Sequence, residues 1–412
     1  MSKLTKYKFS DLYNMASGIS STKEQAGHGS PFLSFSVVFN NYFVPDVLND
    51  LMDTSEKEKD TYSIKEGDIF LTRTSEVVDE LAMSCVAVKD YPEATFSGFL
   101  KRLRPTQDNI TYPKFMAFYL RSPMFRKTMT NNAVMTLRAS LNEAIFSYLD
   151  LLLPAYSEQR KAGDLLYLLN QKIALNNRIN AELEAMAKTL YDYWFVQFDF
   201  PDANGKPYKT SGGKMVYNAT LKRDIPAGWE VKTLSQIANI TMGQSPAGES
   251  YNEDGIGTLF YQGSTDFGWL FPAPRQYTTS PARMAKKGDI LLSVRAPVGD
   301  MNIANADCCI GRGLAALNSK TGSDGFLFYV MKYFKQVFER RNSEGTTFGS
   351  ITKDDLHSLS VVYPQSALLK KYDNIVSDYN KMIFVRSLEN RDLAKLRDWL
   401  LPLLMNGQAI VK

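Results

Sequence analysis

Three short patterns in this sequence contain residue types that catalysts use, and the first is glycine-rich. Gly311, Gly313 and Ala316 spell G-x-G-x-x-A, the shape of a loop that binds dinucleotide phosphates. Such a loop needs a helix N-terminus directly after the glycines, but the next residues, LAALNSKTG, run into turn residues instead. The pattern therefore favours a strand whose glycines allow another backbone to approach closely.

The second pattern resembles the metal site of a nuclease. Pro201 and Asp202, followed by Glu230 and Lys232, imitate the arrangement in which carboxylates hold a cation and a lysine assists the attacking water. Asp202 lies in a segment rich in Gly and Pro, however, and Glu230 and Lys232 alternate as exposed residues of a strand would. We expect linker and surface residues here, and a nuclease is the minor alternative.

The remaining catalytic signals are weaker. The Gly-Lys pairs at Gly205 and Gly213 lack the glycine five residues earlier that a phosphate-binding loop requires. The chain has only two histidines and three cysteines, which suits neither a metal knuckle nor a disulfide framework. No Asn-Pro-Pro-aromatic motif of an adenine methyltransferase is present. We therefore predict no catalytic residue and no metal site in this chain.

Side chains that recognise nucleic acid are better represented. Arg, Gln, Ser and Thr read base edges or contact phosphates, and they occur on expected loops in both halves of the chain. The predicted DNA-binding residues are Ser20, Arg73, Thr74, Ser75, Arg138 and Ser140 in the first half, and Gln244, Ser245, Gln262, Ser264, Arg295, Thr346, Thr347 and Ser350 in the second. The alternative is that these are ordinary polar surface loops.

Two long helices must position these loops. The stretch from about Glu158 to Phe198 contains no Pro and has its only Gly near the start. Its apolar residues repeat with coiled-coil spacing, and the C-terminal stretch repeats the pattern about 210 residues later. The predicted helix-pairing residues are Leu165, Leu169, Asn176, Leu183 and Leu190 in the first helix, and Ile375, Tyr379, Arg386, Leu393 and Leu400 in the second; Met186, Met382 and Leu396 share this heptad lattice. An antiparallel pair would bring the polar centres around Asn176 and Arg386 close together.

The segments before each helix also repeat. KEGDIFLTRTSE and KKGDILLSVRAP each contain a Gly-Asp turn, at Gly67 and Gly288, that leads into an aliphatic strand. We predict that each strand ends in an arginine at its tip, Arg73 or Arg295. Short strands mixed with helices, without strict β-α-β alternation, predict an α+β fold with a pseudo-twofold internal repeat.

Composition sets the remaining limits. At 412 residues with 44% hydrophobic residues, the chain is long enough for two or three domain cores. A net charge of +4 permits nucleic acid as a partner but does not demand it. No apolar run reaches the length of a membrane span and the first residues lack a signal peptide's apolar core, so we expect a cytoplasmic protein without membrane contact.

Taken together, these segments resemble the DNA specificity subunits of type I restriction-modification systems. The resemblance rests on GWEVKTLSQIANITMGQSP, KKGDILLSVRAPVGD, GTTFGSITKDDLHSLSVVYP, the heptad helices and LRDWLLPLLMNGQ, in the order usual for that family. It implies target recognition domains at residues 1–156 and 219–365, a spacer helix at 157–198, a linker at 199–218 and a C-terminal spacer helix at 366–412. The two helices would form an antiparallel coiled coil.

The resemblance also implies how such a chain works. Each domain would read one half of an asymmetric, interrupted site in double-stranded DNA, and the chain itself would bind no cofactor. Two modification subunits would carry S-adenosylmethionine and methylate adenine, and two restriction subunits using ATP and Mg can join them for translocation and cleavage. The first half departs more than the second from the sequences usual in this family, because TRTSE and TLRAS replace the typical loop sequences.

One alternative from another functional class remains open. A coiled-coil protein whose duplicated domains bind other proteins would share the helices and the weak net charge. Failure to bind duplex DNA in the presence of modification partners would favour this scaffold, which is the alternative to a DNA-reading subunit.

Overall fold

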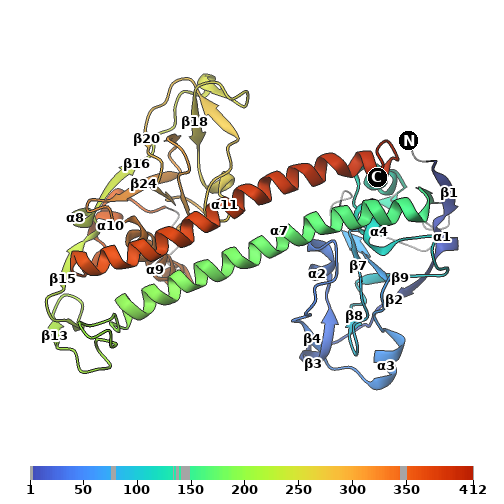
Figure 1. Ribbon diagram of the computed structural model, residues 1–412, viewed down its shortest axis with the longest axis horizontal. Helices are drawn as coiled ribbons and strands as arrows, with labels where there is room; N and C mark the ends of the chain where they lie inside the picture. The colour runs from blue at the N-terminus through green and yellow to red at the C-terminus, as the bar shows by residue number, and fades with distance from the viewer. Residues whose placement is uncertain are drawn as a thin grey trace. The chain divides into compact units, whose positions relative to one another are not determined.

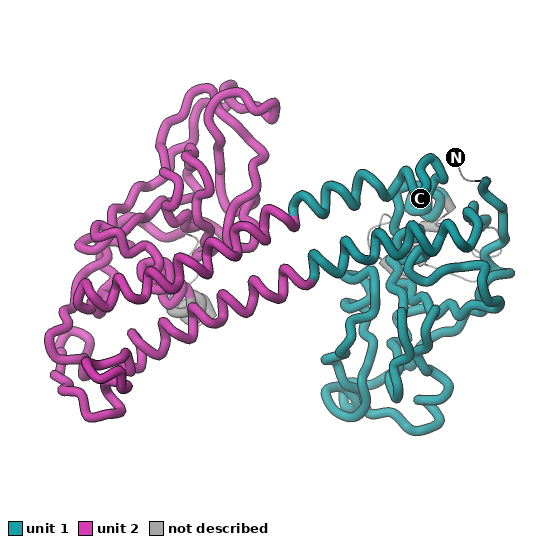
Figure 2. Tube along the Cα trace, viewed as in Figure 1, with its two compact units in different colours: residues 1–174, 391–412 teal, residues 175–390 magenta. Residues whose placement is uncertain are grey.

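The protein is described from a computed structural model of the 412-residue chain. The described residues are 3–75, 80–132, 134–135, 139–140, 149–343 and 350–411; side chains at 74–75, 132, 134–135, 139–140 and 336–343 are not included. The chain forms two compact units, residues 1–174 with 391–412 and residues 175–390 (Figure 2). The unit boundary falls inside both long helices.

The first unit contains a four-stranded antiparallel sheet of order β2-β9-β5-β7. Its strands are β2 (Tyr13–Ser17), β9 (Leu100–Pro105), β5 (Ile69–Thr72) and β7 (Ser84–Val86). A second sheet has the order β4-β3-β8, with β4 (Leu51–Met52), β3 (Ala26–Leu33) and β8 (Thr95–Phe96), and β1 (Thr5–Lys8) pairs with β12 (Asp150–Leu153). The short strands β6 (Thr74–Ser75), β10 (Val134–Met135) and β11 (Ala139–Ser140) form a third sheet. The helices are α1 (Phe9–Leu12), α2 (Phe35–Asn40), α3 (Glu56–Thr61), α4 (Pro113–Tyr119) and α5 (Pro123–Asn132).

The second unit repeats this plan with the sheet order β16-β24-β21-β22. These strands are β16 (Ala238–Met242), β24 (Leu314–Ser319), β21 (Ile290–Ser293) and β22 (Met301–Ile303). A five-stranded sheet contains β17 (Tyr251–Asn252), β19 (Gln276–Thr278), β18 (Thr258–Tyr261), β23 (Cys308–Ile310) and β20 (Met284–Ala285), and β15 (Glu230–Thr233) pairs with β25 (Ser360–Tyr363). The helices are α8 (Leu234–Ile237), α9 (Asp324–Ser343) and α10 (Lys353–Ser358) (Figure 1).

Strand β5 and strand β21 show why the two halves fold alike. Ile69 and Leu71 enter one hydrophobic core and Phe70 enters another, because successive side chains of a strand point to opposite faces. In β21, Ile290 and Leu292 face one core and Leu291 the other. Each strand is therefore buried on both faces and lies inside its sheet, which confirms the α+β class and the internal repeat.

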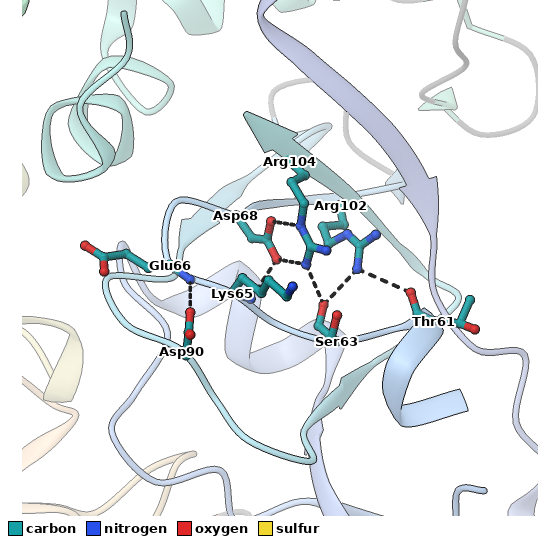
Figure 3. Close-up of polar contacts among 8 residues, drawn as sticks. All are labelled: Thr61, Ser63, Lys65, Glu66, Asp68, Asp90, Arg102 and Arg104. Atoms are coloured by element: carbon teal, nitrogen blue, oxygen red, sulfur yellow. Dashed lines mark hydrogen bonds and ion pairs between the residues drawn. The ribbon is translucent and has the colours of Figure 1, made fainter. Parts of the chain in front are cut away.

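The turn before each of these strands is held by a buried aspartate. The Asp68 side chain is 0% exposed, accepts the Lys65 backbone N–H at 2.8 Å and accepts two hydrogen bonds from Arg104, at 2.6 and 2.7 Å (Figure 3). This hydrogen bonding with Asp68 raises the pKa of Arg104. Neighbouring Arg102 donates to the Ser63 carbonyl at 2.7 Å, so both arginines of β9 are engaged in holding the fold.

The corresponding aspartate of the second unit is Asp289. It accepts the Lys286 backbone N–H at 2.8 Å, as Asp68 accepts that of Lys65, but its other oxygen accepts the Asn318 side-chain amide at 3.0 Å. A neutral amide thus takes the place of the Arg104 guanidinium. The same turn is stabilised by an ion pair in one unit and by a neutral hydrogen bond in the other.

The long helices α7 (Tyr156–Tyr191) and α11 (Ser366–Met405) lie side by side with opposite chain directions (Figure 1). Within the second unit, Asn176 of α7 contacts Glu389 of α11, and the Tyr372 hydroxyl of α11 donates to the Ala187 carbonyl of α7. Residues further along α7 therefore contact residues earlier in α11, as in an antiparallel pair. A π-helical segment, Asp192–Val196, continues α7. The expected antiparallel helix pair is confirmed.

The predicted helix-pairing residues are all at least half-buried. Leu183 and Asn176 are buried, and Leu165, Leu169, Leu190, Ile375, Tyr379, Arg386, Leu393 and Leu400 are half-buried. The two polar centres do meet as expected, but not through Arg386, whose guanidinium donates to the Met382 carbonyl of its own helix at 3.1 Å. Glu389 and Asn390 meet Asn176 instead.

Three residues of the expected heptad lattice face solvent. Met186 is 51% exposed, Met382 38% and Leu396 42%, whereas neighbouring Ala187 and Ile383 are each 1% exposed. Straight α-helices drift by about 20° per heptad relative to a 3.5-residue repeat. In addition, α7 packs against α9 as well as α11, as the stacked Tyr191 and Tyr329 rings show. The buried stripe therefore shifts by one residue.

The stretch expected to be a loose linker is ordered. Its last four residues form β13 (Met215–Asn218), which pairs with β14 (Arg223–Pro226) in a hairpin. The Phe200 ring stacks on Tyr208 at 4.6 Å and on Trp229 at 5.0 Å between ring centroids. Asp202 accepts the backbone N–H groups of Asn204 and Lys206 at 2.8 and 2.9 Å. Aromatic stacking and turn hydrogen bonds fix this segment despite its glycines.

Candidate nucleic-acid interface

Several predicted residues of the second unit meet where β16, β18, β21 and the β23–β24 turn end. The Gln244 backbone N–H donates to the Ile310 carbonyl at 3.0 Å, and the Gly313 N–H donates to the Gln262 carbonyl at 3.2 Å. The Val294 N–H donates to the Gly313 carbonyl at 2.9 Å, which places Arg295 beside the same turn. We call this group, Gln244, Ser245, Gln262, Arg295 and Arg312, the second strand-end cluster.

The glycines of the G-x-G-x-x-A pattern allow this cluster to form. A Cβ atom at Gly311 would lie 2.5 Å from the Gln262 side-chain oxygen, and one at Gly243 would lie 2.1 Å from the Gly311 carbonyl oxygen. Strand β24 begins at Leu314, directly after this turn, so no helix N-terminus follows. The interpretation as close backbone approach is correct for this pattern, and the dinucleotide-binding interpretation is wrong.

Arg295 follows strand β21 at its exposed end. Its side chain is exposed and makes no hydrogen bond or ion pair with another described residue. Its backbone forms a β-bridge with Ser350, and the Ile351 N–H donates to the Val294 carbonyl at 2.9 Å. Two of the predicted DNA-binding residues, Arg295 and Ser350, therefore lie next to each other. Thr346 and Thr347 lie outside the described residues.

Ser264 lies just beyond Gln262, at the start of a short 3-10 helix, Ser264–Asp266. Its side chain is half-buried. The adjacent Asp266 accepts a hydrogen bond from Arg275 at 2.6 Å, so Arg275 already has an anionic partner. Arg275 is therefore a weaker candidate for a phosphate contact than Arg295.

Arg312 is a candidate that the sequence interpretation missed. Its side chain is exposed between Gly311 and Gly313, and it has no side-chain partner among the described residues. A usable signal was present, because a charged residue between two glycines, flanked by the apolar runs CCI and LAAL, must sit at a turn between two buried strands.

The first unit has a matching strand-end cluster with different side chains. The Ile19 N–H donates to the Phe96 carbonyl as the Gln244 N–H does to Ile310, so Ser20 corresponds to Ser245. The Ser97 N–H donates to the Leu33 carbonyl as the Gly311 N–H does to Tyr261, so Ser34 corresponds to Gln262. By the same comparison, Gly98 occupies the position of Arg312. Ser20, Ser34, Arg73, Thr74 and Phe99 form what we call the first strand-end cluster.

The pairing of Arg73 with Arg295 is wrong by one residue. The Arg73 N–H donates to the Phe99 carbonyl as the Val294 N–H does to Gly313. Ser140 pairs with Thr74 in β11 and β6, whereas Ser350 bridges to Arg295. Thr74 therefore corresponds to Arg295. Arg73 is still exposed and remains a candidate, but it corresponds in position to Val294, one residue before Arg295.

Other first-half candidates are only partly placed. Ser75 pairs through its backbone with Ala139 in the sheet of β6 and β11, and Arg138 lies outside the described residues. Phe99, which was not predicted, is 67% exposed beside Arg73. An exposed aromatic ring next to an arginine can stack on a base or contact a thymine methyl group. No pattern in the sequence indicated that the Phe99 ring would be exposed.

The competing chemistries find little support. Burial raises the pKa of the Cys308 thiol to about 12, so this thiol is a poor nucleophile near neutral pH. Glu230 pairs with Lys232 at 3.0 Å, while Asp202 accepts turn N–H groups. Among the described residues, no three His, Cys, Asp or Glu side chains gather as a metal site.

An open cavity of about 560 Å³ lies elsewhere in the second unit. Phe271, Asp324, Asp373 and Phe384 contribute to its lining, and none of the predicted DNA-binding residues does. Burial raises the pKa of both Asp324 and Asp373. Each carboxylate accepts a backbone N–H near the start of α9, from Ser319 and Phe326 respectively, which gives both a structural role.

In the part of the chain that the structure describes, no helix combines the length and the hydropathy needed to cross a bilayer.

Known proteins are similar to this chain in sequence or in fold. The chain is 29% identical over 408 residues to the type I restriction enzyme MjaX specificity subunit of Methanocaldococcus jannaschii, across 96% of this chain and 91% of that protein. It is 22% identical over 442 residues to the HindI specificity subunit of Haemophilus influenzae, across 92% and 94%. A solved S subunit from M. genitalium shares the fold, with a TM-score of 0.66, 15% identity and coverage of 98% and 96%.

The family description "Type I restriction modification DNA specificity domain" matches residues 1–185 and 226–381, which together make up most of the chain. The two matched segments contain the two strand-end clusters. The chain therefore belongs to the family of type I restriction-modification DNA specificity subunits.

Proposed function

We propose that this chain reads a bipartite, asymmetric site in double-stranded DNA and directs adenine methylation and restriction by partner subunits. The domain formed by residues 1–156 reads one half-site, and the domain formed by residues 219–365 reads the other. This proposal refines the family assignment, which gives DNA specificity without the form of the site.

One observation carries the proposal. By backbone pairing, different residue types occupy corresponding points of the strand ends in the two units: Ser34, Gly98 and Thr74 in the first, and Gln262, Arg312 and Arg295 in the second. Base edges differ in their pattern of donors and acceptors. Equivalent positions with unlike side chains therefore suit two half-sites of different sequence.

Exposure supports the same interpretation. Arg73, Phe99, Arg295 and Arg312 are exposed, whereas Arg102 and Arg104 donate to backbone or carboxylate groups inside the first unit. Free arginines are suited to guanine edges and phosphates. Each unit thus presents at least one exposed arginine at its strand ends that is available for DNA.

The catalytic steps belong to partners in this proposal. Two modification subunits bind S-adenosylmethionine and transfer its methyl group, and restriction subunits, where present, use ATP and Mg. The chain itself holds no cofactor and catalyses nothing. Its contribution is to select the sequence that the partners modify.

Spacing comes from the helix pair. Helix α7 has 36 residues and α11 has 40, so at about 1.5 Å per residue they are about 54 and 60 Å long. We propose that they act as a ruler that sets the number of base pairs between the half-sites. The half-sites would then lie roughly one turn of duplex apart, on a similar face.

Selection from a random duplex pool tests the proposal. The chain, purified with its modification partner, should enrich two conserved blocks separated by a fixed number of unconserved positions. Changing residues of the second strand-end cluster should alter only one block. A pool that stays random would contradict DNA reading and favour a protein-binding scaffold.

A further inference from the structure

Gln262 is held by a short hydrogen-bonded chain at the centre of the second strand-end cluster. The Ser245 hydroxyl donates to the Gln262 side-chain oxygen, Oε1, at 3.0 Å. The backbone N–H of Arg312 donates to the same Ser245 hydroxyl oxygen at 3.3 Å. Ser245 therefore links the β23–β24 turn to the Gln262 amide.

These two hydrogen bonds fix the orientation of the Gln262 side-chain amide. A serine hydroxyl has one proton to donate, and here it goes to Gln262 Oε1 while Arg312 occupies a lone pair. The Oε1 atom also lies over Gly311, where a Cβ atom would approach it to 2.5 Å. The amide oxygen is thus turned toward the protein, and its NH2 group has no hydrogen-bond partner among the described residues.

The orientation has a consequence for base reading. A glutamine that reads adenine uses both ends of its amide, accepting from N6 and donating to N7. A glutamine whose oxygen is engaged offers mainly its two N–H donors. Guanine presents two acceptors, O6 and N7, on its major-groove edge. The exposed Gln262 side chain therefore matches guanine better than adenine.

We propose that Gln262 reads a guanine in the half-site of the second domain and that Ser245 is the positioning residue that makes it prefer guanine to adenine. This inference rests on the proposed function. It assigns guanine to Gln262, and it assigns to Ser245 the role of fixing the orientation of the Gln262 side-chain amide.

The first unit contains no such device at the corresponding positions. Ser34 replaces Gln262, and its hydroxyl lies 3.1 Å from that of Ser36. Ser20, which corresponds to Ser245, has no amide to orient. A guanine preference set by an oriented glutamine is accordingly expected only in the half-site of the second domain.

The test uses the chain with its modification partner and measures methylation of duplexes varied at each base of the recognition site. Gln262→Ala identifies the affected position by loss of its base preference. At that position the wild type should prefer guanine to adenine by about 10-fold or more. Ser245→Ala should reduce this ratio to about twofold or less, with the other positions unchanged.

Two further variants separate positioning from general damage. Ser245→Thr retains the hydroxyl and should keep the wild-type guanine preference. Gln262→Glu replaces the amide donors with carboxylate acceptors and should shift the base preference toward cytosine. Ser235→Ala, a hydroxyl deletion in the same unit away from the cluster, is the matched control. All variants are compared by thermal unfolding.

Several outcomes would overturn the assignment. They are a wild-type preference for adenine at this position, an unchanged ratio in Ser245→Ala, or an equal loss at every position. A wild-type complex with no base preference in either half would overturn the proposed function itself, and the assignment with it.

Discussion

The Asn176 amide of α7 donates hydrogen bonds to Glu389 at 2.8 Å and to Asn390 at 2.9 Å, across the interface with α11. Asn176 is 1% exposed, so this polar contact lies inside an otherwise apolar seam. A buried polar pair of this kind specifies which residues face each other, because any other register would leave the groups unsatisfied.

Asn176→Leu should lower the free energy of unfolding of the chain by about 1–3 kcal/mol. The substitution removes the donor that Asn176 provides to the half-buried side chains of Glu389 and Asn390. Asn177→Ala is the matched control: Asn177 is exposed and accepts one hydrogen bond from Asn390, so its loss should cost about 1 kcal/mol or less. Urea unfolding measures both; equal losses would argue against a register-setting role for Asn176.

Arg104→Ala should destabilise the first unit by about 3–5 kcal/mol, because it leaves the fully buried Asp68 carboxylate without its cation. The second unit provides the control. Asn318→Ala removes a neutral donor from Asp289 and an exposed hydrogen bond with Asn239, and should cost about 1 kcal/mol. The comparison is made by denaturant unfolding of each variant, and a cost for Asn318→Ala as large as that for Arg104→Ala would refute the distinction.

Asp373→Asn should make the chain more stable near neutral pH. Burial raises the pKa of Asp373 in the folded state, so the folded state binds its proton more tightly than the unfolded state does. Stability from this group is present below the ordinary carboxyl pKa and is lost as pH rises through the raised pKa. The variant should melt higher than wild type at pH 7 and like wild type below pH 4. A lower melting temperature at pH 7 would contradict this sign.

Arg295→Ala should relax or abolish recognition of one half-site. A guanidinium at a strand end contributes about 1–3 kcal/mol to discrimination when it contacts a base. Lys370→Ala removes an equal charge from the exposed side of α11 and should leave recognition unchanged. Sequencing of the sites methylated by each complex distinguishes the two variants; wild-type methylation by Arg295→Ala would remove this residue from the interface.

A matched deletion tests the ruler. Residues 173–179 of α7 and 387–393 of α11 lie opposite each other around Asn176. Removing both heptads shortens the pair by about 10.5 Å, which corresponds to about 3 base pairs. The gap in the methylated motif should shorten while both half-site sequences persist. An unchanged gap would mean that the helices do not set the spacing.

Much of the fold could be predicted because duplication makes weak signals reinforce each other. The Gly-Asp turns at Gly67 and Gly288, with their buried strands, identified the repeat, and the heptads identified the helix pair. Residues such as Met186 were misplaced because packing against α9 adds a second buried side to α7, and one helix alone does not reveal its neighbours.

The candidate site was less predictable. Aligning arginines by residue type matched Arg73 with Arg295, whereas backbone pairing matches Thr74 with Arg295. Arg312 was overlooked because its flanking glycines were considered for a phosphate loop and for close backbone approach, but not for the turn that exposes the residue between them. The contact between Ser245 and Gln262 joins residues 17 positions apart through strands whose register depends on tertiary structure. Such contacts need the fold before they can be recognised.

DNA reading by this chain is tested by a genome-wide map of methylated adenines in the native host and in a strain lacking this chain, with production of the modification subunit verified in both. We expect an asymmetric motif of two blocks with a fixed gap, methylated in both halves, to be present in the first strain and absent from the second. Identical maps would contradict it, and would leave the duplicated domains to bind something other than DNA.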